Sequence, residues 1–234
     1  MRRSLRSEGS AHSLRRFLTA VPGVLLAALL VSSSCSRDAD TLRRKAEHGD
    51  PAAQFGLAAA YANGKGVPQD HVEAAKWLRK AAGQGHLQAR FNLGVACANG
   101  IGVPRDPSEA VTWFRMAAEQ GHPGARNNLG AAYSSGLGVP RDDAEAVKWF
   151  RMAAEQGHPQ AQASLGVAYR TGRGVPRDDL QAYFWFSLAM DGSPGKAPDW
   201  LARAKDQAAK TLSSGQRMEA QRRIAGWKAM HRGK

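Results

Sequence analysis

The sequence predicts an all-α fold, a solenoid of stacked helix-turn-helix repeats, on three observations. A heptapeptide occurs four times, as GKGVPQD, GIGVPRD, GLGVPRD and GRGVPRD, and each copy starts 36 residues after the previous one, at Gly64, Gly100, Gly136 and Gly172. Alanine and glycine recur at helical spacing before and after every copy. Aromatic residues make up only 7% of the chain, which does not favour a sheet protein. A constant period of this size is typical of repeat architectures.

The charge and the cysteines limit the classes of partner. The 234-residue chain carries 33 Lys and Arg against 20 Asp and Glu, a net charge of +13. Such a surplus favours anionic neighbours, namely lipid head groups, acidic polysaccharide or an acidic protein. Two cysteines in very different settings, Cys35 and Cys97, do not indicate a disulfide framework.

Residues 1–34 have the pattern of an export signal. A basic start precedes an apolar run from Phe17 to Val31, which is shorter than the ~20 residues that a membrane-spanning helix needs. Three serines then lead to Cys35, as in the bacterial lipobox, although Ser32 stands where that motif prefers leucine. We expect Cys35 to become a lipid-bearing N-terminus, with Ser36 after it favouring the outer over the inner membrane. Plain secretion after cleavage near Ser34 and an uncleaved anchor are the alternatives.

Residues 35–40 are expected to form a tether, followed by a half repeat at 41–49 and by units of 36 residues that start near 50, 86, 122 and 158. The first helix of a unit carries small and apolar residues at i, i+4, i+5 and i+8, such as Ala125, Leu129, Gly130 and Tyr133. The second helix carries one tryptophan per unit, for example Trp149, and we expect this side chain to supply most of the buried area.

The heptapeptide between the two helices is explained by its turn chemistry. Its first glycine is expected to end a helix in the left-handed conformation, its second to serve the turn, its valine to fill the gap and its proline to stop the helix. The aspartates that follow are expected to cap the second helices, with Glu or Gln three residues later forming a capping-box-like pair. The pairs are Asp70 with Glu73, Asp106 with Glu109, Asp142 with Glu145, and Asp178 with Gln181.

His86, His122 and His158 recur at the same period in the links between units. Equivalent positions in successive units should lie roughly 8 to 10 Å apart, whereas the ligands of one zinc ion lie ~2.0 to 2.1 Å from it. We therefore expect structural roles for these histidines, and neither a metal nor a cofactor. After Met190 the period fails, and residues 193–234 are expected to form capping helices over Asp199–Leu212 and Gly215–Met230.

The pattern A-x3-L-G-x2-Y-x2-G-x-G-V-x2-D-x3-A-x2-W-x3-A-A-E-Q-G-H, complete from Ala125 to His158, resembles the Sel1-like repeat, a relative of the tetratricopeptide repeat. The resemblance covers about Thr41 to Met190. It implies a right-handed α/α superhelical solenoid that gathers partner proteins, in many members at the bacterial envelope. It also implies that first helices line a concave groove, here with Phe55, Phe91, Val95, Asn127 and Val167, together with Ala59, Ala131 and Ala163.

A second candidate surface is a basic face on the second helices, formed by Arg79, Arg115 and Arg151, with an ordinary solvated face as the simpler interpretation. Cys97 replaces a tyrosine of the other units and is expected to be a buried packing thiol, the alternative being a redox-active one. The aspartates and glutamates are explained by capping, and no nucleophile elbow, phosphate loop or zinc spacing is present.

The sequence therefore predicts a non-enzymatic scaffold in the bacterial envelope, anchored to a membrane by lipid at Cys35, which binds partner proteins in the groove. One alternative is binding of acidic polysaccharide through the basic face; nucleic acid is not expected, because export removes the chain from the cytoplasm. The other is a β-lactamase-like enzyme, since a cysteine-rich branch of the resembled family is associated with β-lactams. That branch has paired cysteines in its repeats, and here the repeats contain only Cys97.

Overall fold

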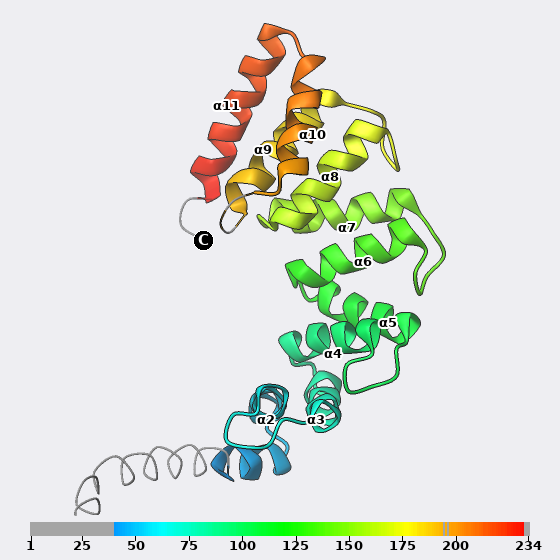
Figure 1. The fold of residues 1–234 in the computed structure, drawn as a ribbon, viewed down its shortest axis with the longest axis vertical. Helices are drawn as coiled ribbons and strands as arrows, with labels where there is room; N and C mark the ends of the chain where they lie inside the picture. Colours follow the sequence, from blue (N-terminus) through cyan, green and yellow to red (C-terminus); the bar gives the residue numbers. More distant parts are fainter. Residues whose placement is uncertain (1–39, 194, 196, 232–234) are drawn as a thin grey trace, which may run out of the picture.

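The computed structural model describes residues 40–193, 195 and 197–231, which form a curved stack of helix pairs (Figure 1). Four pairs follow one another, and in each a first helix is joined to a second by the heptapeptide loop. The pairs are α2 (Pro51–Asn63) and α3 (His71–Gly83), α4 (Leu87–Asn99) and α5 (Pro107–Glu119), α6 (Pro123–Ser135) and α7 (Asp143–Glu155), and α8 (Pro159–Thr171) and α9 (Asp179–Gly192). The expected all-α solenoid is confirmed.

Two short connections make the stack regular. The first glycine of each heptapeptide ends the preceding helix in the left-handed region, with Gly136 at φ 74° donating its N–H to the carbonyl of Ala132. The aspartates cap the second helices as expected, since Asp142 Oδ1 accepts from the backbone N–H of Glu145 at 2.9 Å. The reciprocal half of the capping box is wrong: the N–H of Asp142 donates to the carbonyl of Tyr133 on the first helix. This bond ties the two helices of a pair together.

The second glycine of the heptapeptide does more than serve the turn. Gly138 has φ 78°, and a β-carbon built on it would lie 2.2 Å from the carbonyl oxygen of Pro107, the first residue of α5 in the preceding unit. Gly102 and Gly174 lie similarly close to the backbone of His71 and Asp143, the first residues of α3 and α7 in the preceding units. The loop therefore packs on the neighbouring unit through bare backbone.

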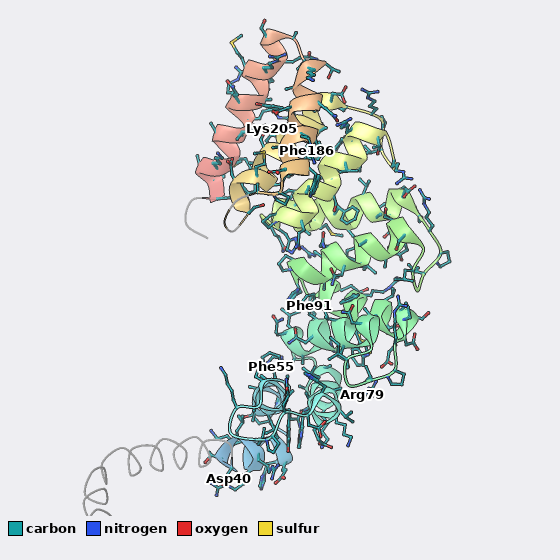
Figure 2. The ribbon with its side chains drawn as sticks, in the orientation of Figure 1. Asp40, Phe55, Arg79, Phe91, Phe186 and Lys205 are labelled. Atoms are coloured by element: carbon teal, nitrogen blue, oxygen red, sulfur yellow. The ribbon has the colours of Figure 1, made fainter. Side chains whose placement is uncertain are left out.

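In the second and third units the buried aromatic is not the predicted tryptophan, whereas Trp185 of the fourth unit is buried as predicted, at 8% exposed. Trp113 and Trp149 are only partly buried, whereas Phe114 and Phe150, one residue later, are 5% and 7% exposed. The phenylalanines face glycines of the first helices, so that a β-carbon on Gly94 would lie 2.7 Å from Phe114 Cδ1. Phe186 takes the same place in α9 and is fully buried among the C-terminal helices (Figure 2).

The two ends of the described stack are covered by further helical segments. Residues 40–47 are helical, and Leu42 packs against α2 beside Gly56. At the other end α10 (Asp199–Lys210) and α11 (Ser214–His231) both contact α9, and α11 folds back along it (Figure 1). Within the described ranges, no helix is both long and apolar enough to cross a membrane. The expected signal peptide, residues 1–34, and Cys35 lie outside the described residues.

Candidate functional site

Two cavities of the same construction lie one repeat apart along the stack, and we call them the repeat cavities. The first has a volume of about 280 Å³ and lies between α4, α5 and α6. The second has a volume of about 380 Å³ and lies between α6, α7 and α8. Each is therefore bounded by the first helices of two successive units and by the second helix between them.

The same repeat positions line both cavities. The floor consists of an alanine, a valine and a phenylalanine of the second helix, and small residues of the following first helix form one wall. The corresponding residues are Ala110 and Ala146, Val111 and Val147, Phe114 and Phe150, Asn128 and Ser164, Ala131 and Val167, Ala132 and Ala168, and Ser135 and Thr171. The 36-residue period therefore copies a largely apolar depression from one unit to the next.

The rims of the two cavities differ in charge. Pro107 and Leu137 border the first cavity, and their equivalents at the second are Asp143 and Arg173. Asp143 pairs with Arg141 at 2.6 Å, and this hydrogen bond lowers the pKa of the Asp143 carboxyl. Trp200 of α10, which is 47% exposed, completes the wall of the second cavity. The surface thus changes from apolar to charged and aromatic towards the C-terminus.

The predicted groove residues divide into two groups. Val95 lines the first repeat cavity and Val167 the second, together with Ala131 and Ala163 respectively. Phe55 and Phe91 are placed one unit apart along the stack (Figure 2) and are stacked on His86 and His122, with ring centroids 4.7 and 4.3 Å apart. These two rings are engaged within the chain, so the cavities present the more open apolar surface.

Asn127 is the remaining predicted groove residue, and it is half-buried on α6. Its Nδ2 lies 3.4 Å from Asn128 Oδ1, and among the described residues its own Oδ1 has no hydrogen-bond partner. It sits one turn before Ala131 but does not line the first repeat cavity.

The linker histidines have a role that the sequence did not reveal: they are the N-caps of the first helices. Nδ1 of His122 accepts from the backbone N–H of Ala125 at 3.1 Å, and Nδ1 of His158 accepts from Ala161 at 3.3 Å. An accepting Nδ1 requires the neutral ring, and burial lowers the pKa of both histidines. In the described part of the chain, no group of three or more His, Cys, Asp or Glu side chains is arranged to hold a metal ion.

The predicted basic face is tied into the stack. The guanidinium groups of Arg115 and Arg151 each donate to a tyrosine hydroxyl of the next first helix, Tyr133 and Tyr169, both at 2.8 Å. Arg79 has no tyrosine to reach, because Cys97 takes that position. It pairs instead with Glu109 at 2.7 Å. All three arginines remain exposed, but each has an acceptor within the chain.

Cys97 is fully buried, which confirms the expected packing thiol. Burial, followed by the charge of Glu109, raises the pKa of the thiol to about 11. The pKa of Glu109 is lowered, first by the hydrogen bond from Arg79 and then by the one from Trp113, whose Nε1 lies 3.1 Å away. The buried thiol therefore lies beside hydrogen-bonded Glu109 and stays protonated at neutral pH.

Sequence reasoning missed Trp200, Asp143 and Arg173 as parts of the second cavity. Trp200 lies outside the repeat, and only its placement over α8 shows its contribution. Asp143 and Arg173 could have been found by comparing units, since each is charged where the preceding unit has an apolar residue.

Comparison with known proteins agrees with this architecture. The family model for the Sel1 repeat matches residues 51–86, 87–122, 123–158 and 159–193, so the chain belongs to the Sel1 repeat family. Sel1 repeat proteins are generally non-catalytic scaffolds for protein interaction. A comparison with curated proteins found no match.

Two solved structures have similar folds. A protective antigen present in uropathogenic Escherichia coli strains, which displays an SLR fold, is 44% identical with a TM-score of 0.65, over 67% of this chain and 33% of that one. A Sel1 repeat protein from Oxalobacter formigenes is 35% identical with a TM-score of 0.66, over 68% of this chain and 66% of that one. The matched region therefore spans about a third of the first of these proteins.

Proposed function

We propose that this Sel1 repeat protein is a non-enzymatic scaffold that binds an extended segment of a partner protein across the two repeat cavities. The observation that carries the proposal is the duplication of one apolar cavity along the stack, with Val95 lining the first copy and Val167 the second. A partner that places one apolar side chain in each cavity would gain binding free energy from the burial of both side chains.

The size and lining of the cavities fit side chains of partner proteins. The first volume, about 280 Å³, lies just below the range of sites that take drug-sized molecules, ~300 to 1,000 Å³, and the second, about 380 Å³, is at its lower end. Full burial of one Leu or Phe side chain contributes roughly 1.5 to 3 kcal/mol, so two cavities together could support a specific complex. The charged rim at Asp143 and Arg173 favours a polar residue of the partner beside the second anchor.

Crosslinking in the native cell tests this function. A photoreactive amino acid at Ala131 in the first cavity and at Val167 in the second should capture the same partner protein. Lys148 is the matched control, because it is exposed on α7, pairs with Glu145 and belongs to neither cavity lining. The same partner from both cavity positions but not from Lys148 supports the proposal, whereas equal capture at all three positions contradicts it.

We propose in addition that the scaffold works at the bacterial envelope, on the periplasmic side of the outer membrane, held by lipid at Cys35. The support is the sequence of residues 1–35, with a basic start, an apolar run and small residues before the cysteine. Replacement of Cys35 by alanine should remove metabolic lipid labelling and release the protein from the membrane fraction. Unchanged labelling and fractionation would exclude the lipid anchor.

A further inference from the structure

A third cavity, separate from the repeat cavities, lies where the C-terminal ends of α9 and α11 meet (Figure 1). Its volume is about 300 Å³. We call it the terminal cavity, and it is lined by Gly157, Gln162, Leu188, Asp191, Gly192, Trp227, Lys228 and His231. Trp227 and Leu188 give it an apolar wall.

Gln162 brings an unused acceptor to this cavity. The side chain is 1% exposed, and among the described residues its Oε1 has no hydrogen-bond partner. The amide cannot be turned round, because its Nε2 donates to the carbonyl oxygen of Ala154 at 3.2 Å. A buried carbonyl left without a donor is destabilising, so the site is poised to accept a hydrogen bond.

The first repeat shows what normally fills this place. Gln54 is the equivalent of Gln162, and its Nε2 likewise donates to a carbonyl, that of Ala46, at 3.1 Å. Its Oε1, however, accepts from Nε2 of Gln84 at 2.7 Å. The carboxamide of Gln84 therefore completes the site in that unit.

The fourth repeat lacks that carboxamide, because the position equivalent to Gln84 is Gly192. A β-carbon on Gly192 would lie 3.9 Å from Gln162 Oε1 and 3.2 Å from Pro159 Cγ, so a side chain there would enter the terminal cavity. The middle repeats have Arg90 and Arg126 in place of Gln162, and these side chains carry no acceptor. Among the described residues, only the fourth unit therefore combines a residue without a side chain, Gly192, with a buried acceptor that has no donor, Gln162 Oε1.

The mouth of the terminal cavity carries one positive and one negative side chain, which form an ion pair. Lys228 Nζ lies 2.5 Å from Asp191 Oδ2, and both side chains are partly exposed. A charged ligand would have to compete with this pair. A neutral group with both a donor and an acceptor can donate to Gln162 and accept from Lys228 without breaking it.

We propose that the terminal cavity binds a primary carboxamide, such as the side chain of an asparagine or glutamine of a partner polypeptide, with Gln162 Oε1 as the acceptor. The ligand takes the place that Gln84 holds in the first repeat. The site lies apart from the repeat cavities, and it does not depend on the function proposed for them.

The test is a titration of residues 36–234, a range that includes every described residue, with propionamide as the probe, read by the indole N–H resonance of Trp227. Propionate, which has the same shape and a negative charge, is the matched probe. Gly192→Gln should fill the cavity with the chain's own carboxamide and so remove the response to propionamide. It should also raise Tm by about 2–4 °C, the shift expected for one added hydrogen bond in a chain of this size. Gly192→Ala, which adds only the β-carbon, should keep the response.

A saturable shift with propionamide, at least several-fold weaker with propionate and absent in Gly192→Gln, supports the proposal. Gly192→Leu, which occupies the space without an amide, should block the probe without the gain in Tm. A cavity that holds only water would give no saturable shift in the unmodified chain, and this would overturn the proposal. An equal response to both probes, or an undiminished one in Gly192→Gln, would also overturn it.

Discussion

The ring of Phe150 lies so close to Gly130 that a β-carbon at that glycine would be 2.7 Å from Phe150 Cδ1. The contact joins the first and second helices of the third unit, and the same relationship connects Gly94 with Phe114 and Gly166 with Phe186. Phe114 and Phe150 also form part of the floors of the two repeat cavities. The glycines of the first helices therefore fix both the core and the site.

Gly130→Ala should destabilise the fold by about 1–3 kcal/mol, although alanine is the better helix former, because the added methyl displaces the ring of Phe150. Gly226→Ala is the matched control, since that glycine lies in the exposed interior of α11 with nothing within 4 Å of the added carbon. The free energy of unfolding of the control variant should rise by roughly 0.5–1 kcal/mol. Urea unfolding followed by circular dichroism measures both, and equal effects would show that the contact is unimportant.

The two glycines of one heptapeptide should respond differently to alanine. At Gly136 the new carbon meets no atom closer than Arg141 Cβ at 3.4 Å, so the cost is that of a left-handed residue, about 1–2 kcal/mol. At Gly138 the φ is similar, but the carbonyl oxygen of Pro107 lies 2.2 Å from the new carbon. We expect Gly138→Ala to lower Tm clearly further. The opposite order would contradict the backbone contact between neighbouring units.

The fold should lose stability in mild acid through its histidine caps. Burial lowers the pKa of His122 and His158 in the folded chain, and the charge of His122 lowers that of His158 further. Below about pH 6.5 the unfolded chain therefore binds more protons than the folded chain. The stability that the neutral histidine caps contribute is complete above that pH and is lost as the pH falls through the folded pKa values.

His158→Asn tests this, because asparagine also caps helices but does not titrate. The fall in Tm between pH 7.5 and pH 5.5 should be smaller by a few degrees in this variant than in the unmodified chain. His71→Asn, at an exposed residue that starts α3, serves as the control and should leave the difference unchanged. If His158→Asn had the same pH dependence as the unmodified chain, the protonation of this cap would not contribute.

Cys97 should be inert in the folded protein, since a buried thiol with a pKa of about 11 is almost entirely protonated at neutral pH. In a Cys35→Ala chain, a thiol reagent at pH 8 should modify Cys97 only after unfolding by guanidinium chloride. Rapid modification of the native chain would contradict the burial and reopen a redox role for this residue.

The stack of helices could be predicted because its signals are local. A glycine that ends a helix and an aspartate that starts the next act within a few residues, so four copies at a constant period indicated α2 to α9. The identity of the buried aromatic could not be predicted, because Trp149 and Phe150 are adjacent and the choice depends on which one meets Gly130 across the helix pair.

The candidate site was predicted less completely, since its parts come from distant units. The resemblance to the Sel1-like repeat indicated Val95 and Val167, but Phe55 belonged to the same predicted row and is instead stacked on His86. Trp200 reaches the second cavity only because α10 packs against α9, and no local pattern specifies that packing. Arg151 looked free on its helix and proved to donate to Tyr169, 18 residues further on.

The most direct test of the central claim is the affinity of the captured partner for variants that place a carboxylate in the repeat cavities. Val95→Asp and Val167→Asp should each raise Kd at least 10-fold, because a charge in an apolar pocket is costly to bury, and the double variant should lose more. Lys148→Asp introduces the same group outside both cavities and should leave Kd within about twofold. An unchanged Kd in a correctly folded double variant would contradict the account.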